Sequence, residues 1–256
     1  MVLSLVVLAS FESSLGSTLS LPARLIDEPE TIIDSENGES QPSAVKEDTA
    51  PQSQADSLAV GHMEAADVVA ETAKQPQKIS KFDNLMKRVG AEMGYDWRFM
   101  SAIAYCESRF KEGLVSKRGA TGLMQVMPIV ARHFKVPVSQ IHNTETNVRL
   151  ACKLLNESEQ RLGFPENISE RDRLCIILAS YNAGLGHVMD ARRLAKADGA
   201  NPNSWSVVSK YLQLKADPAY YTRSEVKAGR FSGSKETLGF VKLAMSKYDE
   251  YCEIAW

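Results

Sequence analysis

The chain has 256 residues, of which 44% are hydrophobic and 24% charged, and its formal net charge is −2. This composition suits one medium-sized domain with a substantial core, together with extra segments. No strongly basic stretch indicates a nucleic-acid partner, and four scattered histidines without an HExxH or CxxC motif argue against a protein-bound metal.

An apolar run from Val2 to Ala9, followed by small residues, opens the chain. Its length is typical of the hydrophobic part of a signal peptide and too short to span a membrane. The basic residues that usually precede such a run are missing, because Arg24 is the first positive charge. We favour an export signal in residues 1–19; the alternative is a terminus without structure.

Residues 20–77 differ in composition from the rest of the chain. They are rich in Glu, Asp, Ser and Pro, and no aromatic residue occurs between Phe11 and Phe82. Such a segment cannot bury enough apolar surface to offset the entropy lost on ordering. We predict a disordered acidic linker over residues 20–77 and a single folded domain over residues 78–256.

Helical patterns begin at residue 82. Apolar residues recur at helical spacing from 82 to 93, where Gly94 ends the pattern. Asp96 predicts the N-cap of a helix that runs from Trp97 to about Phe110. After a glycine-containing loop, Pro128 predicts the start of another turn or helix.

The second half of the domain continues in the same way. Residues 145–162 predict a long amphipathic helix, and Ser169 with Asp172 resembles a capping box before the apolar run 173–182. Residues 186–199, 204–212 and 236–255 predict three more helices. We find no alternating strand pattern, so the predicted fold class is all-α, or nearly so.

The four cysteines all lie in the C-terminal part of the chain: Cys106, Cys152, Cys175 and Cys252. In an exported protein an even number permits two disulfides, with three pairings. The first three lie in apolar helical patterns, where a free cysteine acts as a small hydrophobe. We favour free thiols.

Glu107 is an unusual residue for its helix. Ile103, Cys106 and Phe110 surround it in the pattern, and a carboxylate in such a place is costly unless it is paired or protonated. Apolar surroundings raise a carboxyl pKa, which is what an acid that protonates a glycosidic oxygen near neutral pH needs. Most glycosidases add a second carboxylate. No Asp or Glu stands between Glu112 and Glu145, which suggests a site that uses one carboxylate.

Three short motifs accompany this helix: ESRF at 107–110, SKRGATGLMQ at 116–125 and ASYNAG at 179–184. Each alone has an ordinary structural explanation, as a helix end, a turn and a core aromatic. Together they resemble the lytic murein transglycosylases of the soluble-lytic-transglycosylase type, which carry E-S, S-x-x-G-A-x-G-L-M-Q and A-Y-N-A-G. Ser180 replaces the usual alanine, and Asn147, Val148 and Leu155 echo an intermediate pattern.

The resemblance covers roughly residues 80–256, and the tail is similar to the catalytic module of membrane-bound lytic murein transglycosylase F. The segments 181–205 and 228–241 and the pair Tyr220–Tyr221 carry this second similarity. We expect residues 20–77 to be too few and too polar to form the solute-binding-like domain that accompanies that module. Family members often have a tyrosine where Phe240 stands, which implies the loss of one hydroxyl from the cleft.

The resemblance implies a lysozyme-like helical domain with a central catalytic helix and a glycan-binding cleft. It implies cleavage of the bond between N-acetylmuramic acid and N-acetylglucosamine without water, giving 1,6-anhydro ends. Glu107 serves as acid and then as base. The expected substrate is the glycan strand of peptidoglycan, with no cofactor, no metal and no nucleic acid. We expect an exported monomer in the periplasm or cell envelope.

By the same resemblance, further residues are expected to hold the glycan. Ser116 and Gln125 are expected to hydrogen-bond the sugars, and Tyr181 and Asn182 to orient Glu107 and line the cleft floor. Gly122 is expected to allow close backbone approach, and Met124 and Tyr221 are expected to contact sugar rings.

Three alternatives remain open at this point. The same fold suits a hydrolytic muramidase, in which water takes the place of the attacking sugar hydroxyl. A catalytically silent peptidoglycan-binding scaffold would keep the fold without turnover. A cytoplasmic helical interaction protein requires that the N-terminal run is no signal.

Overall fold

Residues 78–254 form helices joined by loops, with no β-strand among them; these are the residues that the structure, a computed structural model, describes. The predicted export signal and linker lie outside the described residues. The predicted all-α class is confirmed for the described part of the chain. In chain order the helices are α1 (Asp83–Met93), α2 (Trp97–Ser108), α3 (Pro128–His133), the 3-10 helix η2 (Val138–His142), α4 (Thr144–Leu162), α5 (Glu170–Ala183), α6 (Leu185–Ala197), α7 (Trp205–Leu214), α8 (Pro218–Tyr221) and α9 (Ser234–Cys252).

The predicted helix boundaries at the start of the domain are mostly confirmed. Gly94 adopts a left-handed conformation, with φ at 81°, and its N–H donates to the Gly90 carbonyl at 2.9 Å. The Asp96 side chain accepts from the Arg98 N–H at 2.8 Å and so caps α2. Pro128 begins α3. The predicted end of α2 at Phe110 is wrong, because the helix ends at Ser108 and Arg109 turns left-handed.

The capping prediction at α5 is confirmed in part. The Ser169 hydroxyl accepts from the Asp172 N–H at 3.1 Å, as a cap does. The Asp172 carboxylate does not bond back to the Ser169 N–H; it accepts from the Ser169 hydroxyl at 2.7 Å and from the Trp205 N–H at 2.6 Å. This carboxylate therefore joins the start of α5 to the start of α7.

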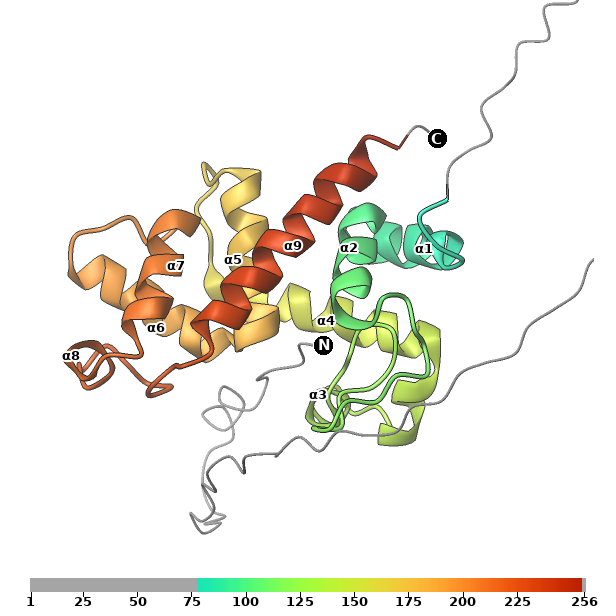
Figure 1. Ribbon diagram of the computed structural model, residues 1–256, viewed down its shortest axis with the longest axis horizontal. Helices are drawn as coiled ribbons and strands as arrows, with labels where there is room; N and C mark the ends of the chain where they lie inside the picture. Colours follow the sequence, from blue (N-terminus) through green and yellow to red (C-terminus); the bar gives the residue numbers. More distant parts are fainter. Residues whose placement is uncertain (1–77, 255–256) are drawn as a thin grey trace, which may run out of the picture. The chain divides into compact units, whose positions relative to one another are not determined.

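The core is built around α5, in which every residue from Leu174 to Ala183 is buried. A helix that is buried on all sides lies at the centre of a helical domain. The final helix α9 packs against both α2 and α5, and α5 also packs against α4 and α6 (Figure 1). Because α9 contacts both helices, it fixes the position of α2 relative to α5.

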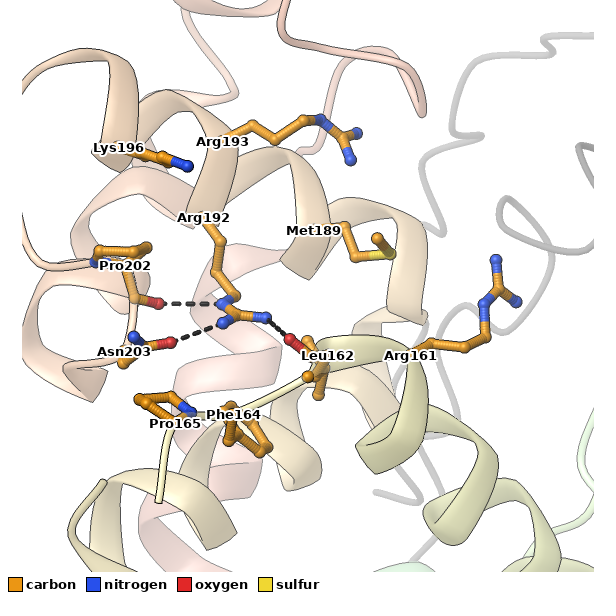
Figure 2. A pocket seen from close by; sticks show the side chains of 11 residues that line it. Arg161, Leu162, Phe164, Pro165, Met189, Arg192, Arg193, Lys196, Pro202 and Asn203 are labelled. Carbon is orange, nitrogen blue, oxygen red and sulfur yellow. Dashed lines mark hydrogen bonds between the residues drawn. The ribbon is translucent and has the colours of Figure 1, made fainter. Parts of the chain in front are cut away.

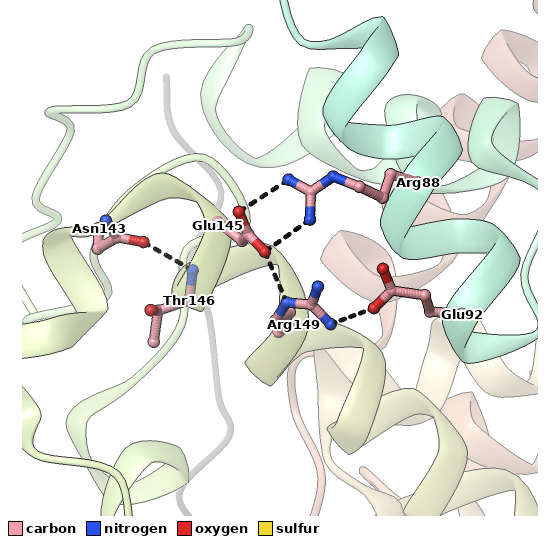
Figure 3. A network of polar contacts seen from close by, with 6 residues as sticks. All are labelled: Arg88, Glu92, Asn143, Glu145, Thr146 and Arg149. Atoms are coloured by element: carbon pink, nitrogen blue, oxygen red, sulfur yellow. Dashed lines mark hydrogen bonds and ion pairs between the residues drawn. The ribbon is translucent and has the colours of Figure 1, made fainter.

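Charged side chains join α1 to the start of α4 (Figure 3). Arg88 donates to both Glu145 oxygens at 2.8 Å, and Arg149 donates to Glu145 at 2.9 Å and to Glu92 at 2.6 Å. These hydrogen bonds hold the pKa of Glu145 down at about 2. The network is exposed to solvent, so it fixes the register of the two helices more than it adds stability.

A buried ion pair fixes the connection before α9. The fully buried Lys215 ammonium donates to Asp190 at 2.5 Å and lies 3.0 Å from His187 Nδ1. Asp190 also accepts from the N–H groups of Lys227 and Ala228 at 2.8 and 2.9 Å. Burial lowers the pKa of His187 to about 4, with Lys215 as the next cause, so this imidazole is neutral and accepts from the ammonium.

The four cysteines are free, which confirms the prediction. Burial raises the pKa of Cys106 and of Cys152 to about 12, and that of Cys175 to about 11. Thiols with such pKa values are poor nucleophiles at neutral pH. None of the described helices is long and apolar enough to cross a lipid bilayer.

Candidate active site

Glu107 is the penultimate residue of α2 and is only 5% exposed. The helix stops directly after it, because Arg109 and Phe110 both adopt left-handed conformations, with φ at 53° and 61°. The Arg109 N–H still donates to the Tyr105 carbonyl at 3.0 Å, which closes the helix end. Two consecutive non-glycine residues in this region are uncommon and cluster at functional sites.

The Glu107 carboxyl has no ion-pair or hydrogen-bond partner among the described residues. Burial alone raises its pKa well above the ordinary value. The sequence-based expectation of a protonated acid in apolar surroundings therefore matches the environment that the structure gives this residue.

The raised pKa of Glu107 makes the stability of the fold depend on pH. The folded protein keeps a proton on Glu107 at pH values where the unfolded chain, with an ordinary pKa near 4.5, has released it. Stability therefore falls as pH rises from about 4.5 through the raised pKa. We expect the melting temperatures of wild type and Glu107→Gln to agree below this window and to separate above it, with the variant higher. Thermal melts at a series of pH values check this, and parallel curves would contradict it.

The serine that follows Glu107 joins α2 to the second motif. The buried Ser108 hydroxyl donates to the Leu123 carbonyl at 2.8 Å and to the Ala104 carbonyl at 3.1 Å. Ser108 therefore does not simply end a helix at the surface. It holds the loop over residues 116–125 against the end of the helix that carries Glu107.

Asn147 of α4 organises the same loop from the other side. Its side-chain carbonyl accepts from the Met124 N–H at 2.8 Å, and its amide donates to the carbonyls of Thr121 and Ile141 at 2.8 and 2.9 Å. The Asn147 side chain that makes these three hydrogen bonds is fully buried. The sequence indicated Asn147 only as part of a pattern and gave it no role.

Gly122 is required by this arrangement. Its φ is 80°, and a Cβ there would lie 2.7 Å from the Asn147 amide nitrogen. The absence of a side chain at Gly122 therefore lets the Asn147 side chain lie close to the loop backbone. Gly122 is buried in the loop, so the structure gives a structural reason for the glycine, and its expected role in the approach of the glycan stays a prediction.

Gln125 carries an unpaired buried atom. The residue has φ at 48°, and its amide Nε2 donates to the Leu114 and Gly122 carbonyls at 3.1 and 2.9 Å. Its Oε1 is buried and has no partner among the described residues. A buried acceptor without a donor is costly, so this oxygen is suited to an N–H or O–H group of a ligand.

Ser116 is half-buried at the start of the same loop. Its hydroxyl oxygen accepts from the Ala120 N–H at 3.0 Å, while its backbone carbonyl accepts from the Gly119 N–H at 2.9 Å. The hydroxyl therefore closes a local turn. Its proton is not used in any bond within the described structure, so the side chain keeps one donor.

The third motif places Tyr181 and Asn182 at the end of α5, each 5% exposed. The Tyr181 hydroxyl donates to the Met124 carbonyl at 2.6 Å, so only its lone pairs remain for Glu107. Burial and then the charge of Glu107 raise the pKa of Tyr181 well above the ordinary value. Asn182 accepts at Oδ1 from the Thr237 hydroxyl of α9 at 2.8 Å, a partner that the sequence did not indicate.

Two expected sugar contacts lack support in the structure. The Met124 side chain is fully buried in the core and has no surface to offer a ring, whereas Met127 is half-buried. Tyr221 lies in α8, which Figure 1 shows at the edge of the domain away from the end of α2.

Phe240, the position where family members often have a tyrosine, is buried on α9. Residues 78–254 contain no group of His, Cys, Asp or Glu side chains placed to hold a metal ion.

A comparison with known families finds the transglycosylase SLT domain over residues 84–203. Residues 84–203 form an SLT domain. The match includes Glu107 and both later motifs, and it ends before α7, so Tyr221, Thr237 and Phe240 lie beyond it.

Relatives of the SLT domain in this chain are named membrane-bound lytic murein transglycosylase F. The protein from Vibrio parahaemolyticus is 36% identical over 168 residues, which are 64% of this chain and 31% of the relative. The one from Alcanivorax borkumensis is 30% identical over 192 residues, or 74% and 40% of the two chains. The chain thus spans less than half the length of these relatives. An inactive mutant of lytic transglycosylase Slt from Pseudomonas aeruginosa has a TM-score of 0.44 and 22% identity, covering 66% of this chain and 23% of that one.

Proposed function

We propose that this SLT-domain protein is a lytic transglycosylase that cleaves the β-1,4 bond between N-acetylmuramic acid and N-acetylglucosamine in peptidoglycan. The observation that supports it most is the buried Glu107 carboxyl, which has a raised pKa and no partner among the described residues. A buried carboxyl with a raised pKa is suited to donate a proton, as a general acid must.

In the first step Glu107 donates its proton to the bridging oxygen. The bond from C1 of the muramoyl sugar to that oxygen breaks, and the N-acetylglucosamine leaves with a new hydroxyl. Positive charge develops at C1, and the muramoyl N-acetyl group is placed to stabilise it. Burial favours this step, because it raises the pKa of Glu107 and so favours the protonated form that donates.

In the second step the Glu107 carboxylate takes the proton of the muramoyl C6 hydroxyl. The C6 oxygen then bonds to C1 and closes the 1,6-anhydro ring. One proton has left Glu107 and one has returned, so the acid is ready for another turnover. No water is consumed and no cofactor is required.

The surroundings of Glu107 favour a single-carboxylate reaction. Glu112, the nearest carboxylate after it in sequence, is exposed and accepts from Lys81 Nζ at 2.9 Å and from the Thr144 hydroxyl at 3.0 Å. These hydrogen bonds lower the pKa of Glu112. A carboxylate held in this way on the surface is poorly placed to serve as the second catalytic group that most glycosidases use.

We assign the glycan-holding roles to the groups that retain bonding capacity. The unpaired Gln125 Oε1 accepts from an amide or hydroxyl of a sugar, and the Ser116 hydroxyl donates to one. The Asn182 amide donates to the substrate while Thr237 fixes its carbonyl. Tyr181 positions the loop through the hydrogen bond from its hydroxyl to the Met124 carbonyl.

We further propose that the protein acts outside the cytoplasm as a monomer, with residues 1–19 as export signal, 20–77 as linker and 78–256 as catalytic domain. The name "membrane-bound" carried by the relatives supports a cell-envelope location. Peptidoglycan, the proposed substrate, is reached only by an exported protein. Fractionation of the host cell, with recovery of the protein in the cytosol, would contradict this.

The mass of the reaction products tests the proposed activity. Digested peptidoglycan should yield muropeptides that end in a 1,6-anhydro ring, each lighter by one water than the hydrolytic product. Mass spectrometry separates the two. Products with reducing ends and no anhydro ring would show a hydrolytic muramidase on the same domain.

A further inference from the structure

A pocket of about 510 Å³ lies between the end of α4, the loop that follows it, α6 and residues 202–203 shortly before α7 (Figure 2). Pockets that bind small ligands have volumes of roughly 300–1,000 Å³. Four of the side chains that line it are basic, and none is acidic. This is a local excess of positive charge on a chain whose net charge is −2.

Arg192 lies at the centre of the pocket in Figure 2. It donates from Nε to the Pro202 carbonyl at 3.0 Å, and from its two terminal nitrogens to the Leu162 carbonyl and to Asn203 Oδ1, both at 2.5 Å. All three acceptors are neutral. A guanidinium has five N–H groups, so two remain, and its charge has no carboxylate partner among the described residues. Burial lowers its pKa, as expected for a cation without a counter-ion.

The other three cations are also weakly neutralised. Lys196 is exposed and forms no ion pair within residues 78–254. Arg161 lies 3.6 Å from Glu157, a separation beyond a good hydrogen bond. Arg193 pairs with Asp190, but Asp190 already neutralises the buried Lys215.

One wall of the pocket is apolar. The Phe164 ring lies 5.2 Å from the Arg192 guanidinium, and Pro165 and Met189 continue the lining. A bare inorganic anion would use the cations and leave this wall empty. A ligand that combines several negative groups with small apolar groups would use both.

The pocket is separate from the candidate active site. None of its lining residues comes from α2, from the loop over 116–125 or from the motif at 179–184. Asn147, which holds that loop, precedes Leu162 by fifteen residues on α4. At 1.5 Å per residue, these two positions are about 22 Å apart along the helix axis.

We propose that this pocket binds a short peptide that carries free carboxylates, the chemistry of the stem peptides that branch from peptidoglycan strands. The carboxylates pair with Lys196, Arg161 and the two remaining N–H groups of Arg192, and alanine methyl groups contact Phe164 and Met189. The pocket holds the polymer at a second point while Glu107 acts at the first. This assignment rests on the proposed function, because that function brings peptidoglycan to the protein.

A binding titration with a synthetic Ala-Glu-diaminopimelate peptide tests it on the full chain at low salt. The test variant combines Lys196→Gln with Arg161→Gln, which removes two exposed charges and leaves the Arg192 hydrogen bonds intact. The matched control is Lys210→Gln, an exposed lysine of α7 outside the pocket. We expect the double variant to bind about fivefold to tenfold more weakly and the control to bind like wild type. A peptide with amidated carboxyls should bind as poorly to wild type.

Several outcomes would overturn the proposal: no binding of the peptide to wild type, equal binding by the double variant, or displacement by an equal concentration of inorganic phosphate. Tighter binding of a synthetic peptide of residues 27–48 would show that the pocket takes the acidic segment of the chain itself. Turnover of peptide-free glycan strands should be the same in wild type and double variant. Absence of anhydro products from wild type would count against the proposed activity and leave the binding result to be judged separately.

Discussion

Glu107→Gln is expected to lower turnover of peptidoglycan by about 1,000-fold or more. General acid or base catalysis by one positioned group contributes roughly 10²–10⁴ in rate. Here one residue is proposed to serve both steps, and the glutamine amide can neither donate the first proton nor accept the second. Release of anhydro-muropeptides over time, measured by chromatography of digested cell walls, gives the ratio.

The same variant should fold as well as wild type, or better. Glutamine keeps the size of the side chain. It also removes the loss of folding stability that arises because the buried Glu107 carboxyl ionises less readily than it does in the unfolded chain. Circular dichroism and thermal melts beside the activity assay establish this point. If the variant is folded, a large loss of activity is caused by the missing acid and base at residue 107 and not by unfolding.

Glu112→Gln is the matched control for this experiment. It makes the same chemical change five residues later, at an exposed carboxylate paired with Lys81 and Thr144. Its turnover should stay within about twofold of wild type, since surface ion pairs contribute little. If wild type and Glu107→Gln both bind cell walls and neither clears them, the chain is a binding scaffold; if Glu112→Gln alone is inactive, the acid has been assigned to the wrong residue.

The sequence predicted the helices well because their signals are local. Gly94, Asp96 and Pro128 act through their own backbone or through the adjacent residues, and each stands where the pattern placed it. The end of α2 was placed two residues late. The apolar Phe110 continues the helical spacing, but Arg109 and Phe110 are left-handed, and the preceding Ser108 bonds to the Leu123 carbonyl, a contact that no local pattern indicates.

The environment of Glu107 was predictable in part for the same reason. Its apolar neighbours along α2 indicated burial, and the structure buries it. The contacts that organise the rest of the site join residues far apart in the sequence, so no local pattern reveals them. Thr237 reaches Asn182 across fifty-five positions, and Tyr181 reaches Met124 across fifty-seven.

The sugar contacts expected of Met124 and Tyr221 show the limit of reasoning from residue types. Methionine suits either a core or a ligand surface, and only the packing of the loop against α4 and α5 decides that Met124 is in the core. The sequence did not indicate the basic pocket, because its cations lie on α4 and α6 and its apolar wall combines Phe164 and Pro165 of the loop after α4 with Met189 of α6. Three of the four cations lie on α6, and only the fold brings Arg161 and the Phe164 ring beside them.

Asn147→Ala is expected to destabilise the fold by about 4 kcal/mol and to reduce activity together with stability. The change leaves the Met124 N–H and the Ile141 carbonyl buried without their partner, and it removes one of the two hydrogen bonds of the Thr121 carbonyl, which still accepts from the Val126 N–H. Each buried polar group that loses its partner costs about 1–3 kcal/mol, although some of these groups will gain water when the site relaxes. Equilibrium unfolding in denaturant measures the free energy of unfolding directly.

Asn156→Ala on the same helix is the matched control for Asn147→Ala. Asn156 is half-buried and donates one bond, to the Met93 carbonyl at 3.2 Å, so its loss should cost about 1 kcal/mol or less. Equal costs for the two variants would show that Asn147 is not the organiser of the loop. If the costs differ as expected, the loss of activity in Asn147→Ala should exceed the fraction unfolded at the assay temperature. Gln125 and Gly122 lie in the loop that Asn147 helps to fix, so the native fraction of this variant should itself be a poorer catalyst.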